Sequence, residues 1–396
     1  MKKITFLALI LSIFLCCGQK HDEVERYMED GVEVIINPLE PHRIKGEPST
    51  LHLDQEFSID FERDDLKEKS IREIIGFDVD SDGNIYFIVS RSDADLILKF
   101  GSNGNFILSF GRRGEGPGEL ITPRYLRVDE SEHIQIADNT RKKIYIFEKN
   151  GDFIRAISLL SNHRIATLLE NGNILAVKNN FNKDIGRGEY PIMLSNADLD
   201  EIKMLHQGLW MPNFTLSKRI NPLRYYMDFN VLRPSNGRIY VGNYGKGYEF
   251  LIYDTEGNLL KKIRKEYNKV KVSEQLKEEI VNGLYKFFDS FEQYKNKVYY
   301  PEFYPPFQFF FLDEESRLYV MTYEQGQGSD AFIYDIFNPD GLFIGRIELN
   351  NYGSSPFSYA GIPVPLNVVA KNKRLYCLRE KESGYKELVV HRMRWE

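Results

Sequence analysis

The sequence predicts an all-β fold, a six-bladed β-propeller of four-stranded antiparallel blades, and three observations lead to it. A short Asp/Asn/Gly-rich turn followed by an apolar strand recurs six times along the 396 residues, tight turns join further apolar runs between the copies, and the final copy is incomplete. Self-similarity at a period of a few tens of residues is the signature of a repeat architecture. The copies occupy residues 80–87, 130–136, 171–176, 235–241, 314–320 and 371–377.

Each copy is followed by a second hairpin. Apolar runs joined by Asn-Gly or Asp-Gly indicate a hairpin, because these residues tolerate the positive φ of tight hairpin turns. Such turns lie at 102–105, 149–152, 255–258 and 339–341, whereas the corresponding turn of the third copy, 196–200, lacks the Gly. Each unit is therefore predicted to be a meander of four strands, a to d from the inside outward.

The sixth unit lacks a strand d, because the chain ends at Glu396 soon after the apolar run at 387–391. Alternating apolar residues at 51–61 supply the missing strand. We expect the ring to close by pairing of the N- and C-terminal strands, which leaves no open edge. Residues 51–396 are predicted to form the propeller, and the alternative is an open solenoid.

The spacing of the copies places the variable loops on one face. The strand-b anchors Ile85, Ile134, Ile174, Ile239, Leu318 and Leu375 are separated by 49, 40, 65, 79 and 57 residues. The extra length lies mainly in the d-to-a connections, at 110–124, 207–228, 264–306 and 350–366. In a propeller these loops and the b-to-c loops emerge on one face, here the long-loop face. The a-to-b and c-to-d turns emerge on the other, here the turn face. Function is expected on the long-loop face.

The N-terminus is predicted to be an export signal. Lys2 and Lys3 precede a largely apolar run of 14 residues, 4–17. A helix that spans a bilayer needs about 20 residues, so the run fits a secretory signal instead. The cysteine that closes it resembles a bacterial lipobox. We therefore expect a lipoprotein signal peptide at 1–16, lipid attachment at Cys17, and a tether at 17–50 with one short strand at 32–36. The alternative is ordinary secretion with an incidental Cys pair.

Composition narrows the function. A net charge of -6 does not indicate nucleic-acid binding, which requires a basic surface. Beyond the N-terminal Cys pair only Cys377 remains, so no disulfide is expected and this thiol is predicted to be buried. The seven histidines show no metal-ligand spacing, and there is no Gly-x-Ser-x-Gly motif. The sequence thus predicts no catalytic residue, metal or cofactor, and we expect a monomer.

The segment that joins the first two repeats resembles a segment of a known repeat family. Residues 110–120, with the sequence Phe-Gly-Arg-Arg-Gly-Glu-Gly-Pro-Gly-Glu-Leu, resemble the junction of NHL-type repeats, and the preceding strand phrase matches as well. Together with the lipobox, the chain resembles the six-bladed β-propeller lipoproteins of Gram-negative bacteria. The first repeat matches closely, whereas the later five share the strand pattern without the full junction. The resemblance implies the propeller fold, and NHL-type propellers generally bind proteins, nucleic acid or small ligands.

The glycine run at 111–118 is predicted to be an inter-blade turn. A phosphate-binding loop needs a helix after it, whereas here Pro117 and Glu119 lead into another strand. Arg112 and Arg113 at the tip of the turn are candidates to contact an anionic ligand, because guanidinium groups suit such ligands.

The insert at 264–306 departs most from the repeat. Ser273 is a candidate N-cap for an amphipathic helix, either packed on the blades or acting as a lid, and an aromatic stretch follows at 299–307. Aromatic residues of the long loops are candidates to line an apolar or sugar-binding cleft, the alternative being core packing. The candidates are Trp210, Tyr225, Tyr226, Tyr300, Phe303 and Tyr304.

These observations favour an envelope-anchored module that binds a protein, peptide or glycan on the long-loop face, with the membrane contacted only through lipid. The protein would be anchored to a bacterial membrane, facing the periplasm or the exterior. The first alternative is a propeller enzyme, a metal-assisted lyase or lactonase acting at the central channel. It would draw on Asp78, Asp138, Asn139 and Asp228, whose other expected role is to cap turns. The second alternative is a structural module of a larger assembly.

Overall fold

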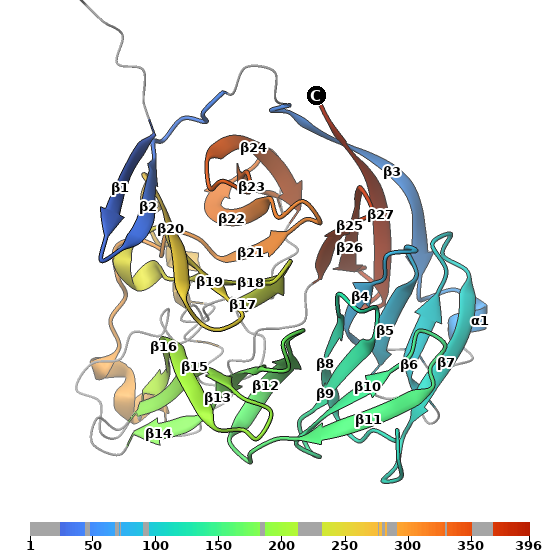
Figure 1. Ribbon diagram of the computed structural model, residues 1–396. Coiled ribbons are helices and arrows are strands. Elements are labelled where there is room, and N and C mark those ends of the chain that lie inside the picture. The colour runs from blue at the N-terminus through green and yellow to red at the C-terminus, as the bar shows by residue number, and fades with distance from the viewer. Residues whose placement is uncertain are drawn as a thin grey trace, which may run out of the picture.

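Six β-sheets stand around a ring in the computed structural model (Figure 1). The structure describes residues 24–43, 48–67, 71, 73–89, 95–182, 187–212, 232–275, 277–278, 282, 291–328, 331–350 and 367–396. Each sheet contains a four-stranded antiparallel meander, so the predicted six-bladed propeller is confirmed.

The blades follow one another along the chain. Blade 1 contains β4 (Ile74–Val79), β5 (Ile85–Val89), β6 (Asp95–Phe100) and β7 (Phe106–Arg112). Blade 2 contains β8 (Pro123–Val128), β9 (Ile134–Asp138), β10 (Lys143–Phe147) and β11 (Phe153–Ser158). Blade 3 contains β12 (His163–Leu168), β13 (Ile174–Lys178), β15 (Arg187–Ser195) and β16 (Glu201–Pro212), with β14 (Asn180–Asn182) added to β15.

The second half of the ring has the same order. Blade 4 contains β17 (Leu232–Ser235), β18 (Arg238–Gly242), β19 (Glu249–Asp254) and β20 (Leu259–Lys265). Blade 5 contains β21 (Phe309–Leu312), β22 (Leu318–Gln325), β23 (Ala331–Phe337) and β24 (Phe343–Asn350). Blade 6 contains β25 (Val368–Lys371), β26 (Arg374–Glu380), β27 (Lys386–Trp395) and β3 (Leu51–Asp60).

The two ends of the chain close the ring. The N-terminal strand β3 lies beside the C-terminal strand β27 (Figure 1), and the two pair antiparallel from Asp60 opposite Glu387 to Leu51 opposite Trp395. Ile59 is fully buried with Leu388 and Val390 in a cluster that also contains side chains of blade 1. The expected closure by the chain ends is confirmed.

The segment for which a tether was predicted contains two strands. β1 (Glu25–Glu29) and β2 (Val32–Asn37) form a hairpin around Asp30 and Gly31, which both have positive φ. β2 pairs parallel with β20, so the hairpin extends the outer edge of blade 4. The buried Asn37 side chain donates to the carbonyl of Gly341 at 3.0 Å and accepts from the Phe343 amide at 2.8 Å. The hairpin therefore also contacts blade 5.

Helical structure is short in the described part of the chain. It comprises α1 (Asp64–Lys67), η1 (Tyr244–Lys246), η2 (Phe291–Lys297) and helical residues among 274–282. The last group follows the predicted N-cap Ser273, but most of the helix predicted there lies outside the described residues. No helix that the structure describes is long and apolar enough to cross a membrane.

Hydrogen bonds in the a-to-b turns explain the recurring pattern of a polar turn followed by an apolar strand. In blade 1 the turn residue Asp80 accepts a hydrogen bond from the hydroxyl of Tyr86 at 3.0 Å, and in blade 5 Asp313 accepts from Tyr319 at the same distance. Both tyrosines are fully buried, so the bond satisfies a polar group that burial would otherwise leave unpaired. Burial, followed by the charge of the aspartate, raises the pKa of each hydroxyl, which keeps it a donor.

Hydrogen bonds on the turn face link every blade to the next. They connect turn or strand-end residues of neighbouring blades at 2.8–3.2 Å, and we call this set the turn-face belt. The pairs are Ser81–Glu132, Gln135–Leu168, Asn173–Thr255, Asn236–Glu314, Asn372–Glu314 and Asn372–Asp80. Each bond satisfies a polar group at a junction, so the belt holds the inner ends of the blades in register.

A buried histidine in blade 3 predicts a pH-dependent stability. His163 is 1% exposed, and neither ring nitrogen has a partner among the described residues. Burial, with the charges of Lys178 and Lys142, lowers its pKa from 6.5 to about 4. Because the folded state disfavours the charged form, this contribution to stability is fully present above pH 6.5 and is lost as the pH falls toward 4. Between pH 6.5 and 5 we expect a loss of about 2 kcal/mol.

Urea unfolding of the wild type and of His163→Leu at several pH values measures this loss. The difference between the two curves isolates His163 from other titrating groups. A wild-type curve that runs parallel to the variant's curve between pH 6.5 and 5 would contradict the prediction.

Candidate functional site

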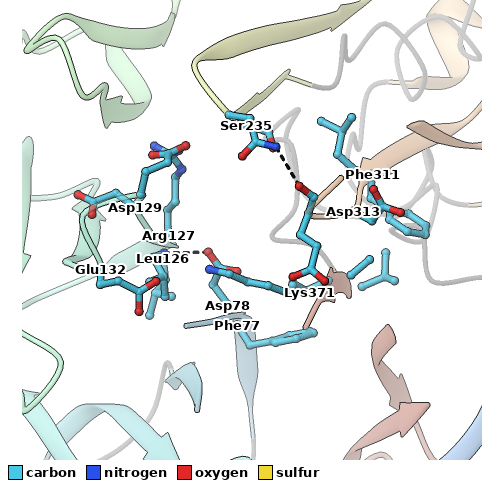
Figure 2. Close-up of a pocket in the computed structure, with 18 of the residues that line it drawn as sticks. Phe77, Asp78, Leu126, Arg127, Asp129, Glu132, Ser235, Phe311, Asp313 and Lys371 are labelled. Atoms are coloured by element: carbon cyan, nitrogen blue, oxygen red, sulfur yellow. Dashed lines mark hydrogen bonds and ion pairs between the residues drawn. The ribbon is translucent and has the colours of Figure 1, made fainter. Parts of the chain in front are cut away.

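A cavity of about 410 Å³ lies at the turn-face end of the central channel. Its walls are the ends of the innermost strands β4, β8, β17, β21 and β25 and the turns that follow them (Figure 2). We call it the channel pocket. The lining residues are Phe77, Asp78, Tyr125, Leu126, Arg127, Val128, Asp129, Glu130, Glu132, Ser235, Asn236, Phe311, Leu312, Asp313, Glu314, Val368, Val369, Ala370 and Lys371.

Asp78 and Lys371 tie three blades together in the pocket. The Asp78 carboxylate accepts from its neighbour Val79 at 2.9 Å and from the Val128 amide of blade 2 at 2.8 Å. The Lys371 side chain extends toward Asp78 (Figure 2), and its Nζ donates to the carbonyl of Val79 at 2.9 Å. Burial raises the pKa of Asp78, although the charges of Lys371 and Arg127 oppose this.

Several carboxylates at the rim are already engaged by backbone groups. Asp129 accepts from the amides of its own turn at 2.9 and 3.0 Å. Glu132 accepts from the Ser81 amide and from Lys149, whose Nζ lies 2.6 Å away. Glu314 accepts from the amides of residues 372 and 373 at 2.8 and 3.1 Å. These carboxylates shape the turns, and none of the three is an unpaired general base.

Arg127 differs from its neighbours because part of its guanidinium has no partner. One terminal nitrogen, Nη2, is paired with Glu130. The other, Nη1, is buried without a hydrogen-bond partner among the described residues, and the whole residue is only 7% exposed. A buried donor without an acceptor costs about 1–3 kcal/mol, and more for a charged group. Arg127 therefore leaves one buried donor unsatisfied in the wall of the channel pocket.

A second cavity of about 450 Å³, the rim pocket, adjoins the channel pocket. The two share Asp313, Glu314 and Lys371, and the rim pocket continues to the last residues of β27. There the Arg317 guanidinium lies 4.9 Å from the centre of the Trp395 ring. The rim pocket thus lies beside the channel pocket on the turn face, at blades 5 and 6.

On the long-loop face, three of the predicted aromatic residues gather around one pair of segments. Residues 270–272 and 302–304 are joined by backbone bonds, such as the Tyr304 amide to the Val270 carbonyl at 2.8 Å. The Tyr304 ring stacks on Tyr323, with centroids 4.3 Å apart and planes at 4°. Lys269 lies 5.7 Å from the Phe303 ring centre, and the Tyr300 hydroxyl donates to the Lys277 carbonyl at 3.3 Å. All three aromatic residues are partly exposed.

Arg112 and Arg113 are both exposed at the junction of blades 1 and 2. Arg112 lies 3.4 Å from the carboxylate of Glu119 in the same loop, with 73% of its side chain exposed. The remaining candidates cannot be placed. Tyr225, Tyr226 and Cys17 lie outside the described residues, and for Trp210 only the backbone is described.

The glycine run between these arginines and blade 2 forms a compact turn. The Glu119 carboxylate accepts from the Gly116 amide at 2.8 Å, and it would lie 2.0 Å from a Cβ added to Gly114. The loop thus satisfies its own backbone amides with an internal carboxylate, where a phosphate-binding loop would leave them for the ligand. This arrangement agrees with the predicted inter-blade turn.

Asp138 caps backbone groups of two segments. It accepts from the amides of Ile121 and Thr122 at 2.7 and 2.9 Å, and from those of Thr140 and Arg141 at 3.0 Å. Of the other proposed channel residues, Asp78 bonds backbone amides as described above, and Asp228 lies outside the described residues. Within the part of the chain that the structure describes, no group of three or more His, Cys, Asp or Glu is arranged to hold a metal ion.

Sequence reasoning missed the channel pocket, although a signal was present. The inner strands of blades 1 and 2 read Phe-Asp-Val and Leu-Arg-Val just before their turns, which places charged Asp78 and Arg127 inside otherwise apolar strands. Charged residues in such positions are rarely buried unless they are paired. The five contributing strands are distant in sequence, so their convergence follows only from the closed ring.

Comparisons with known proteins agree with this architecture. Residues 66–207 match the model of a protein family described as a 6-bladed β-propeller. Over 48 residues the chain is 42% identical to Protein lin-41 of Caenorhabditis elegans, a match covering 12% of this chain and 4% of that protein. The chain thus spans only a small part of the length of this curated relative.

Solved structures show the same architecture. A candidate exported protein of Bacteroides fragilis superposes with a TM-score of 0.50 at 11% identity, covering 92% of this chain and 99% of that one. A protein of an uncharacterised family from Bacteroides vulgatus gives 0.49 at 13% identity over 88% and 99%. Virginiamycin B lyase of Staphylococcus aureus gives 0.39 at 8% identity over 87% and 99%. At identities this low the likenesses concern the fold alone.

Proposed function

We propose that this protein is a non-catalytic, ligand-binding propeller of the bacterial cell envelope, and that its ligand occupies the channel pocket. The observation that carries the proposal is the unsatisfied Nη1 donor of Arg127, a residue in the wall of a cavity of about 410 Å³. Small-molecule sites are concave, mostly apolar and equipped with a few polar groups that fix orientation, with volumes of about 300–1,000 Å³. The channel pocket is concave and lies within this range of volumes, but ten of its nineteen lining residues are polar or charged, so it suits a polar ligand.

The chemistry of the rim favours binding over catalysis. A general acid or base must be free to exchange a proton with the substrate. Asp129, Glu132 and Glu314 instead accept bonds from backbone amides at 2.8–3.2 Å, and Lys371 donates to a backbone carbonyl. A metal-assisted lyase or lactonase, the alternative, requires its substrate to be chemically converted, so the experiment below measures conversion as well as binding.

The envelope location rests on the N-terminal residues. Lys2, Lys3 and the apolar run that ends at Cys17 suit export followed by lipid attachment. Cys17 precedes the first strand by eight residues, and β1 lies at the outer edge of blade 4. Partners of the protein are then envelope components, and lipid is its only membrane contact.

Ligand-detected NMR on the purified protein tests the proposal. A low-molecular-mass extract of bacterial envelopes serves as the source of ligand, and the bound molecules are recovered and analysed. Wild type is compared with Arg127→Met and with Arg113→Met, which removes an exposed arginine from the loop joining blades 1 and 2. We expect binding by the wild type and Arg113→Met, loss of binding in Arg127→Met, and recovery of an unchanged ligand.

Three results would overturn the proposal: no bound molecule, a bound molecule that is chemically converted, or binding that survives in both Arg127→Met and Arg127→Lys. Thermal unfolding of each variant separates a loss of binding from a loss of folding. Arg127→Lys serves as a second variant because it keeps the charge while shortening the hydrogen-bonding reach.

A second binding surface is the aromatic group on the long-loop face. The stack of Tyr304 on Tyr323, with Phe303 and Tyr300 partly exposed beside it, favours a flat ligand face such as a sugar or a peptide side chain. If binding is lost in Tyr304→Ala but kept in Arg127→Met, the ligand binds at this surface and not in the channel pocket.

A further inference from the structure

We infer that the ligand of the channel pocket is a neutral, hydroxyl-rich molecule of the sugar class. This inference rests on the proposed function and names the chemistry of its ligand. It follows from three properties of the pocket: the sign of its charge, the balance of hydrogen-bond donors and acceptors, and the nature of its floor.

The charge of the pocket disfavours an anion. Six carboxylates line it, those of Asp78, Asp129, Glu130, Glu132, Asp313 and Glu314, against the two cations of Arg127 and Lys371. Two further cations, Lys149 and Arg317, pair with Glu132 and Asp313, so the carboxylates still outnumber the cations by two. Arg127 is itself paired with Glu130, which leaves little of its charge for a second anion. Like charges in a partly buried site repel strongly because the effective dielectric constant is well below that of water. A carboxylate or phosphate ligand would therefore meet a net negative field.

The open hydrogen-bonding group disfavours a cation. Arg127 Nη1 is a donor, and an ammonium or guanidinium ligand has no acceptor to offer it. A ligand that satisfies Nη1 must offer an acceptor, and in this negative surrounding an oxygen of an uncharged group fits best.

The remaining polar groups favour a ligand that donates many hydrogen bonds. Carboxylates have about four acceptor sites each, and the bonds described above use only part of them. A sugar hydroxyl both donates and accepts, so one molecule can give its hydrogens to the rim carboxylates and one oxygen to Arg127. Neutral amides offer one donor for each acceptor but lack this density on a compact frame.

The floor of the pocket suits the apolar face of a sugar ring. Among the apolar lining residues, Phe77 and Val368 are buried, whereas Tyr125 and Val369 are partly exposed. Tyr combines a flat apolar face with a polar hydroxyl, a combination suited to a ring with hydroxyls at its edge.

Three probes that share one ring and differ in charge test the inference: N-acetylglucosamine (neutral), glucosamine (cationic) and glucuronate (anionic), with glucose as a second neutral probe. Binding is followed by saturation-transfer NMR at about 10 mM, where a Kd near 1 mM is readily detected. We expect the neutral probes to bind, glucuronate to bind at least about tenfold more weakly, and Arg127→Met to weaken neutral binding about 10- to 100-fold. The matched variant Arg113→Met should bind like the wild type.

The outcomes separate this inference from the proposed function. If glucosamine binds most strongly and its binding weakens as salt is added, the ligand is a cation and the inference is wrong. If glucuronate binds most strongly, the ligand is an anion and the inference is also wrong. If no probe binds while the envelope extract still yields an Arg127-dependent ligand, the inference fails and the proposed function stands. If neither probe nor extract binds, both fail.

Discussion

Replacing Ile59 with alanine is expected to lower the free energy of unfolding by about 2–5 kcal/mol, the range found for truncation of a buried Ile or Leu. Ile59 is fully buried on β3, opposite Leu388 of β27, in a cluster that joins blade 6 to blade 1. The substitution leaves a cavity at the point where the chain ends meet. Urea denaturation measures the loss, and hydrogen exchange of residues 386–395 should accelerate more than that of blade 3.

Ser58→Ala is the matched control. Ser58 lies next to Ile59 on the same strand but is exposed, so its replacement should change stability by no more than about 0.5 kcal/mol. If Ile59→Ala lowers the free energy of unfolding no more than Ser58→Ala, the pairing of the chain ends does not hold the ring closed. The same conclusion follows if hydrogen exchange accelerates by the same factor in all blades.

Replacing Asp335 with alanine is expected to cost about 3–5 kcal/mol, because it leaves a buried cation without its partner. Asp335 is 1% exposed between blades 4 and 5, where it pairs with Lys265 at 3.4 Å and with Arg346 at 2.8 Å, and accepts from the Tyr248 hydroxyl at 2.9 Å. The Lys265 side chain is completely buried. Burial lowers the pKa of this lysine, and burial raises the pKa of Asp335.

Two further variants identify the cause of this loss. Glu324→Ala removes the more exposed carboxylate paired with Arg346 at 2.9 Å, and it should cost about 1 kcal/mol or less. The double variant Asp335→Ala, Lys265→Met removes both buried charges and should recover part of the stability. An Asp335→Ala protein no less stable than Glu324→Ala, or a double variant less stable than the single one, would contradict this account.

The strand pattern could be predicted because each strand is specified locally. Strand b of each of the first three blades is completely buried, and the turns that begin them contain Asp, Asn or Gly, so the period and the turn chemistry agree. The missing strand of blade 6 was predicted by the same logic, since an unpaired edge requires a partner and the alternation at 51–61 provides one.

The outer hairpin could have been found, because Asp30-Gly31 is a strong turn signal between two alternating segments. The surrounding charged residues instead suggested a tether. Its docking on β20 could not have been derived, since it depends on Asn37 contacting backbone groups of residue 264 in blade 4 and of residues 341 and 343 in blade 5.

The candidate site was harder to predict because the most visible sequence features lie on the opposite face from the pockets. Loop length and aromatic content drew attention to the long-loop face, whereas both described pockets open on the turn face. Arg127 stands out only when its lack of a partner is known, and a missing hydrogen bond has no sequence signature.

Hydrogen–deuterium exchange of the protein with and without the envelope-derived ligand shows which face of the propeller the ligand covers. We predict that protection on binding is concentrated in residues 125–130, 311–314 and 368–371, the walls of the channel pocket. Protection confined to residues 299–304 and the neighbouring long loops, with the channel segments unchanged, would contradict the account.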